Sequence, residues 1–187
     1  MLVLNIIEKS FEKEFEIGFS LDHPHIIKYL NKGNDKTGTF IVTEYVDGKT
    51  LREHLKGGTI FSKEQLHKII NQIFEAITYL HKKNIIHLDL KPENILLSDT
   101  TGNIKLIDFG FSYRDGQLPV KTGTKKYISP EQNSHPEKVS VKNDLYSIGV
   151  IIIELFTGKT DVSEVNRLPK NYRKVVQQCL NTTTEQI

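Results

Sequence analysis

The 187-residue chain contains no tryptophan and a single cysteine, Cys179. One thiol cannot form an internal disulfide, which excludes the small disulfide-stapled scaffolds of secreted proteins. Cys179 lies in a segment with apolar residues at helical spacing, a pattern that predicts a buried structural thiol rather than a reactive one. These features favour a protein of the reducing cytoplasm.

Long apolar runs and a strong net charge are also absent. The apolar run 148–153 ends at Glu154 and falls far short of the ~20 residues that a membrane span needs. Residues 1–7 are apolar but lack the basic region of a signal peptide, and we interpret them as a strand. A formal net charge of +2, with no basic cluster that alternates with aromatics, argues against nucleic acid. We expect neither a membrane nor a nucleic acid among the partners.

Two polar segments between apolar runs carry the chemistry. The first, His87-Leu88-Asp89-Leu90-Lys91-Pro92-Glu93-Asn94, precedes Asp108-Phe109-Gly110. Each residue alone is ordinary in turns, but the ordered set suits phosphoryl transfer. Asp89 can take the proton of an acceptor hydroxyl, and Lys91 can offset the charge of the phosphoryl group. Asn94 and Asp108 offer the oxygen ligands that Mg²⁺ prefers.

Together these segments resemble the catalytic loop and metal-binding motif of the eukaryotic-type protein kinase family. The similarity extends along nearly the whole chain. Residues 39–48 look like the fifth strand and hinge, 123–131 like the P+1 segment, and 144–149 like the start of the central helix. The resemblance implies an α+β, bilobal, protein-kinase-like fold in a single domain that is truncated at both ends.

Within that fold, the resemblance places a reduced N-terminal lobe with its hinge at residues 1–47. It implies a few antiparallel strands and one helix there, the family's helix C. Residues 48–187 would form a mainly helical C-terminal lobe that lacks the family's last helices.

The resemblance also implies an ATP site and a class of acceptor. Thr43 matches the gatekeeper, and the backbone of Glu44 and Val46 would face the adenine. Thr124 lies in the substrate-facing P+1 segment. Together with Lys91, it is typical of serine/threonine kinases rather than tyrosine kinases.

Three features of the sequence depart from the family pattern. No G-x-G-x-x-G loop precedes the first strand, so part of the phosphate positioning is missing. Residues 2–5 match the third strand, which places Asn5 at the position of the phosphate-binding lysine and Glu14 at that of the lysine's partner. Leu88 replaces the arginine that receives an activation-loop phosphate, for which Thr122 is the candidate site.

Local patterns predict the remaining elements. Ser62 and Gln65 form a capping box before an apolar stripe that runs to Leu80, typical of a long helix. Further predicted elements are a helix over 12–21, a buried strand over 40–42, a hairpin with its turn at 100–103, a helix over 141–157 ended by Gly158, and a helix over 172–180.

The resemblance also implies a stack of side chains between the lobes, formed here by Gly18, Tyr29, Phe109, His87 and Asp144. Because Gly18 has no side chain, we expect a gap at the top of the stack and a loosely held helix. The alternative is that Tyr29 or Phe19 leans over and fills the space.

Three functions remain open. The first is a serine/threonine protein kinase that uses ATP and Mg²⁺ on a protein substrate, with its activity limited by the missing loop and lysine. The second is a pseudokinase or kinase-like module that regulates a partner protein by binding. The third, a small-molecule phosphotransferase, would lack residues 108–110 joined to 123–131. We favour the first.

Overall fold

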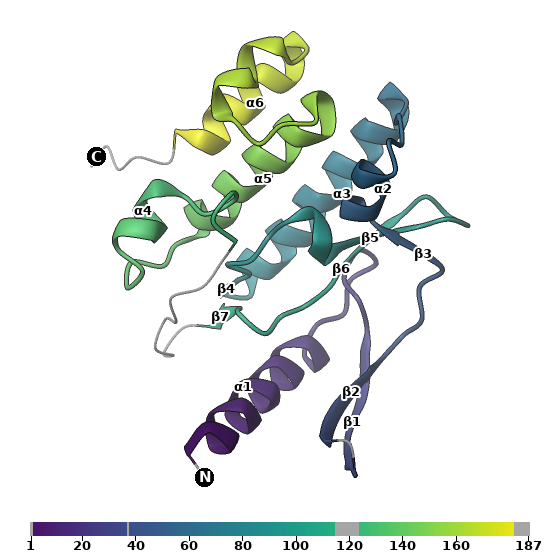
Figure 1. The fold of residues 1–187 in the computed structure, drawn as a ribbon, viewed down its shortest axis with the longest axis vertical. Coiled ribbons are helices and arrows are strands. Elements are labelled where there is room, and N and C mark those ends of the chain that lie inside the picture. The colour runs from purple at the N-terminus through teal and green to yellow at the C-terminus, as the bar shows by residue number, and fades with distance from the viewer. Residues whose placement is uncertain (1, 37, 115–123, 182–187) are drawn as a thin grey trace.

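The computed structural model describes residues 2–36, 38–114 and 124–181. Its smaller part contains helix α1 (Leu2–Phe19) beside an antiparallel pair of strands, β1 (Tyr29–Asp35) and β2 (Gly38–Thr43) (Figure 1). The larger part is mainly helical. The chain is therefore an α+β protein with a small sheet and one helix on one side, as the sequence predicts.

The larger part begins at Gly48. Its elements are β3 (Gly48–Thr50), α2 (Leu51–Lys56), α3 (Lys63–Lys82), β4 (Ile85–Ile86), the 3₁₀ helix η1 (Pro92–Asn94), β5 (Ile95–Ser98), β6 (Ile104–Leu106), β7 (Tyr113–Arg114), α4 (Pro130–Ser134), α5 (Val141–Thr157), the 3₁₀ helix η2 (Val162–Arg167) and α6 (Lys170–Leu180). Strands β3, β5 and β6 form one antiparallel sheet, and β4 pairs with β7. The predicted hairpin around residues 100–103 is confirmed as β5–β6.

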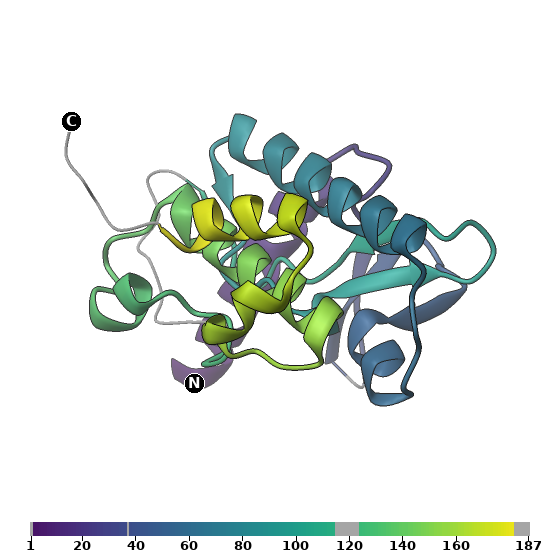
Figure 2. The same cartoon turned by 90° about the horizontal axis from the view of Figure 1, so that it is seen from above.

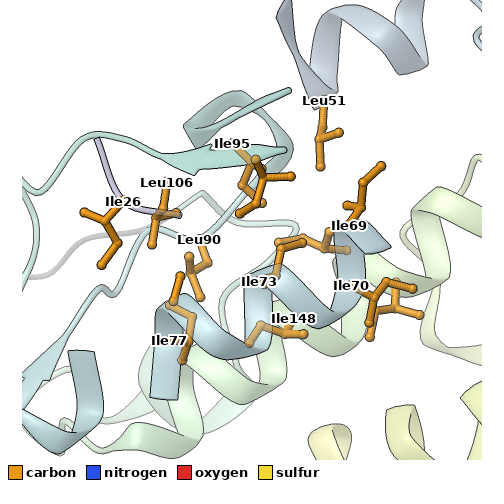
Figure 3. Packing of buried hydrophobic residues seen from close by; sticks show 14 of the residues in the cluster. Ile26, Leu51, Ile69, Ile70, Ile73, Ile77, Leu90, Ile95, Leu106 and Ile148 are labelled. Atoms are coloured by element: carbon orange, nitrogen blue, oxygen red, sulfur yellow. The ribbon is translucent and has the colours of Figure 1, made fainter. Parts of the chain in front are cut away.

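Helix α3 forms where the capping box predicts it. The Ser62 hydroxyl accepts the backbone N–H of Gln65, and the Gln65 side chain accepts the backbone N–H of Ser62. One face of the helix is buried. Figure 3 shows Ile73 and Ile77 of this face turned toward Leu90 and the β5–β6 hairpin. Each such side chain contributes roughly 1.5–3 kcal/mol through burial, which makes α3 one wall of the core.

Helix α5 is the centre of the larger part. It packs against α3 and α6, and the three helices lie together in Figure 2. Its buried run includes Ile148 and residues 150–153. The helix ends at Gly158, whose φ of 72° is a left-handed conformation that glycine adopts without a Cβ penalty. The predicted bounds of α5 are confirmed, and the last helix, α6, is present but begins at Lys170, two residues before the predicted start.

The smaller part is joined to the β5–β6 hairpin through its backbone. Ile27 donates its N–H to the Leu106 carbonyl at 2.9 Å, and Leu106 donates to the His25 carbonyl at 2.9 Å. The Lys105 ammonium also contacts the Glu44 carboxylate at 2.6 Å. These contacts fix the hinge side of the smaller part against the strands that carry the candidate site.

Two predictions for the smaller part are wrong. Residues 2–7 belong to helix α1 rather than a strand. No glycine or proline interrupts the chain from Leu2 to Ile17, and a helix satisfies its own backbone hydrogen bonds, whereas a strand needs a partner. Strand β2 exists but is not buried: Phe40 is 42% exposed and Val42 39%. A two-stranded sheet covered on one face by a single helix leaves the other face open to solvent.

We predict that Cys179 reacts slowly with a disulfide reagent in the native protein. Its side chain packs against Gly149, and burial raises the pKa of the thiol to about 11. The nucleophile is the thiolate, so at pH 8 little of the native thiol is reactive, whereas unfolding in urea exposes it and restores an ordinary pKa. The rate of thiol titration in buffer and in urea measures this. Equal rates, each matching free glutathione, would contradict the burial of Cys179.

Candidate active site

The loop between β4 and β5 is held by one buried carboxylate. Asp144, at the start of α5, is 0% exposed and accepts the backbone N–H groups of His87 and Leu88, each at 2.9 Å. His81 Nε2 lies 2.8 Å from the same carboxylate. Leu88 has a φ of 66°, an unfavourable conformation for a branched side chain. The two hydrogen bonds to a charged acceptor stabilise that conformation and so set the direction of the next residue, Asp89.

The side chains predicted to carry the chemistry meet directly after this point. The Lys91 ammonium contacts Asp89 Oδ2 at 2.5 Å and donates to the Thr124 hydroxyl at 3.1 Å. Thr124 in turn donates to Asp89 Oδ1 at 3.2 Å. The Asn94 amide donates to the backbone carbonyl and to Oδ2 of Asp89, at 2.9 and 3.1 Å. The structure thus brings Asp89, Lys91, Asn94 and Thr124 into one hydrogen-bonded cluster.

Asp108 reaches the same region from the end of β6. The Ile107 N–H donates to the Asn94 carbonyl at 2.9 Å, so the backbones that carry Asn94 and Asp108 are directly joined. Asp108 has a φ of 65°, and its Oδ1 accepts the Gly110 N–H at 3.1 Å. This turn holds the carboxylate of Asp108 in a defined direction.

The predicted stack of side chains between the two parts is present. Phe109 is fully buried, and its ring centroid lies 6.0 Å from that of Tyr29 and 5.3 Å from that of His87. Burial lowers the pKa of His87, which keeps its imidazole neutral inside the stack. The stack ends on Asp144 through the backbone of His87.

The expected gap at Gly18 does not exist. A Cβ atom built on Gly18 would lie 2.5 Å from the Tyr29 ring, so the ring already occupies the space. The alternative, that Tyr29 leans over the glycine, is the one observed, while Phe19 is 59% exposed. A larger residue at position 18 would collide with Tyr29. The gap that was expected to leave the helix loosely held is therefore absent.

The predicted hinge is anchored at both of its ends. Glu44 donates its N–H to the Lys28 carbonyl and accepts the Lys28 N–H and the Lys105 ammonium through its carboxylate. Partial burial works against ionisation, but these two donors lower the pKa of Glu44 overall. Asp47 accepts hydrogen bonds from the hydroxyls of Ser98 and Thr100 on the β5–β6 turn. Thr43 ends β2, and Val46 packs against the core.

The remaining predicted site residues belong to the smaller part or lie outside the described residues. Glu14, on α1, accepts the Tyr29 hydroxyl at 2.9 Å, and burial raises the pKa of its carboxyl. Asn5 lies in α1 rather than in a strand, and its role as the replacement of a lysine stays a prediction. Thr122 lies outside the described residues.

Sequence reasoning missed Arg52, on α2. Its guanidinium contacts Glu93 of η1 at 2.8 Å and Glu154 of α5 at 2.8 Å, and it also bonds the hydroxyl of Tyr127. Tyr127 donates to Glu154 at 2.5 Å. One signal was in the sequence: Glu154 interrupts a buried apolar run, and a carboxylate in that setting needs a cation.

Comparisons with known proteins identify the family of this chain. A family model described as "Protein kinase domain" matches residues 4–187. The chain is 35% identical over 181 residues to Aurora kinase of Schizosaccharomyces pombe, covering 94% of this chain and 50% of that protein. It is 37% identical over 157 residues to serine/threonine-protein kinase PrkC of Bacillus subtilis, covering 81% of this chain and 24% of PrkC. Against Aurora kinase B of Mus musculus the values are 34% over 176 residues, 91% and 49%.

The chain therefore spans about half the length, or less, of these curated relatives. In the described ranges 2–36, 38–114 and 124–181, no helix combines the length and apolarity that crossing a bilayer requires.

We predict that Asp144→Asn lowers the free energy of unfolding by about 3 kcal/mol, because breaking a buried charged interaction costs about that much. An amide offers one acceptor oxygen and two donors, so one of the two loop N–H groups would face another donor. Urea denaturation measures the change, with Asp99→Asn on the exposed β5–β6 turn as the matched control. If both variants kept the stability of the parent, Asp144 would not be the anchor of the loop.

Proposed function

The chain belongs to the protein kinase family, and from that membership we propose that it is a serine/threonine protein kinase. It transfers the γ-phosphate of ATP to a serine or threonine hydroxyl of a protein substrate. The observation that carries the proposal is the cluster of Asp89, Lys91 and Thr124, in which a carboxylate, an ammonium and a hydroxyl lie within 3.2 Å of one another.

Asp89 is the proposed base. Its side chain is 3% exposed and accepts hydrogen bonds from three side chains, which fixes both of its oxygens. The acceptor hydroxyl of a substrate would take a place beside Asp89 like the one the Thr124 hydroxyl occupies, and give its proton to the carboxylate as the phosphoryl group arrives. The Lys91 ammonium, which here contacts Asp89, would then interact with the transferring phosphoryl group and offset its negative charge. Loss of a positioned base of this kind typically costs 10²–10⁴-fold in rate.

Asn94 and Asp108 are the proposed magnesium ligands. The Asn94 amide nitrogen is turned to Asp89, so its oxygen faces the other way, and Asp108 is held by its own turn. Among the described residues no three histidine, cysteine, aspartate or glutamate side chains gather as a metal site. Two oxygen ligands suit Mg²⁺, which keeps waters and phosphate oxygens in its shell. When bound, the ion offsets the charge of the ATP phosphates.

The hinge is the proposed adenine site. The N–H of Glu44 is used by Lys28, so Glu44 can offer its carbonyl to a purine, and the backbone of Val46 can offer a second group. The part of the molecule that would cover the nucleotide is small, with α1 beside the two-stranded sheet of β1 and β2. We therefore propose weak ATP binding and slow transfer by a cytoplasmic chain in which residues 1–47 and 48–187 form the two lobes of a single kinase-like domain.

We predict slow, magnesium-dependent transfer to a serine/threonine peptide library, and a loss of at least about 100-fold in Asp89→Asn because the base is removed. Incorporation of γ-labelled phosphate measures the rate, with Asp99→Asn as a control that keeps the site. An equal rate in Asp89→Asn would mean that another group is the base or that a contaminant supplies the activity.

Nucleotide binding separates the two remaining functions. The midpoint temperature of thermal unfolding should rise with millimolar Mg-ATP in the parent and rise less in Asp108→Asn, in which a neutral amide replaces the charged magnesium ligand. Binding without transfer would favour the pseudokinase alternative. The absence of both would exclude the proposed enzyme and leave a binding module that does not use ATP.

A further inference from the structure

Tyr29 is a buried side chain to which the proposed chemistry gives no role. It begins β1, is 5% exposed, and its ring touches both α1 and the Asp108-Phe109-Gly110 turn. The ring lies edge-on to Phe109 at 6.0 Å and to Phe15 of α1 at 6.5 Å between centroids. A single rigid ring thus joins the helix of the smaller part to the turn that carries Asp108.

Gly18 is the residue that admits this ring. Three ring atoms of Tyr29 would lie 2.5–2.7 Å from a Cβ atom at position 18, closer than any side chain allows. A glycine inside a helix costs about 0.5–1 kcal/mol relative to alanine, and here the close approach of the ring offsets that cost. The position of Tyr29 is therefore set by the backbone of α1 itself.

The hydroxyl of Tyr29 then acts on a carboxylate. It donates to Oε1 of Glu14 at 2.9 Å. A Cβ atom at Gly110 would lie 3.2 Å from Oε2 of Glu14 and 3.3 Å from Oδ1 of Asp108, so the two carboxylates meet over this glycine. Like charges that lie close together repel, and burial, together with the charge of Asp108, raises the pKa of Glu14. Without the hydrogen bond from the Tyr29 hydroxyl, the Glu14 side chain would lower this repulsion by turning away from Asp108.

We propose that Tyr29 is a positioning residue, whose hydroxyl holds Glu14 over Gly110 against the repulsion of Asp108 and so keeps the Asp108 turn in the conformation that receives Mg-ATP. The ring fixes α1 to Phe109, and the hydroxyl fixes the side chain of α1 that faces the turn. The nucleotide part of this inference rests on the proposed function; the hydrogen bond from the hydroxyl to Glu14 and the contact of the ring with Phe109 do not.

Tyr29→Phe tests the hydroxyl alone, because the ring and its contacts remain. We predict that the Kd for Mg-ATP rises about tenfold, the effect of losing a hydrogen bond to a charged group. The matched control is Tyr79→Phe, which also loses a tyrosine hydroxyl bonded at 2.9 Å, to the Asp22 N–H, outside the candidate site. Both variants should lose similar thermal stability without nucleotide, but only Tyr29→Phe should lose affinity.

A second variant tests the repulsion. Adding Glu14→Gln to Tyr29→Phe removes the charge that faces Asp108, so we predict that the double variant regains most of the lost affinity. Equal Mg-ATP affinity in Tyr29→Phe and Tyr79→Phe would overturn the inference while leaving the proposed function intact. A double variant as weak as Tyr29→Phe would also count against it.

Hydrogen exchange supplies a readout that needs no nucleotide. Amides of residues 108–112 should exchange faster in Tyr29→Phe than in the parent or in Tyr79→Phe. Unchanged exchange there would overturn the inference even if the parent chain bound no Mg-ATP, a result that by itself would contradict only the proposed function.

Discussion

The buried carboxylate of Asp144 is the constraint on which the candidate site depends. It accepts two successive backbone N–H groups of the loop that carries Asp89, and one belongs to Leu88, whose φ is left-handed. A backbone in that conformation persists only where its surroundings fix it. Because Asp144 lies on α5, the most buried helix of the described chain, the loop inherits the rigidity of the core. The carboxylate of Asp89, the proposed base, thus lies on a loop but is positioned by a helix.

The smaller part of the molecule is built differently. Its sheet has two strands, and the face that carries Phe40 is partly open to solvent. It is joined to the larger part by backbone hydrogen bonds around Leu106 and by the contact of Tyr29 with Phe109. The side of the site that would take a hydroxyl substrate is therefore densely bonded, whereas the side that would take a nucleotide depends on few contacts. This contrast is the physical reason to propose slow transfer rather than none.

Local signals predicted the larger part well, since they act within one turn of chain. Ser62 begins α3 and Gly158 ends α5 as expected. Predictions failed where the deciding neighbour is distant or the pattern is short. The apolar run 2–7 fits a strand or a helix equally, and only its continuation into the rest of α1 decides. Gly18 looked like a gap because no sequence pattern shows that the ring of Tyr29, in another element, would cover it.

Arg52 has a consequence for how this sequence can change over evolutionary time. One guanidinium serves carboxylates on two other elements and the hydroxyl of Tyr127. Replacing Arg52 first would leave the buried carboxylate of Glu154 without a cation, and replacing Glu154 first would leave a cation without its main partner. Neither single step is neutral. The positions are therefore epistatic, and a descendant of this chain can exchange the cluster only by concerted substitution, which ties the drift of α2 to that of α5.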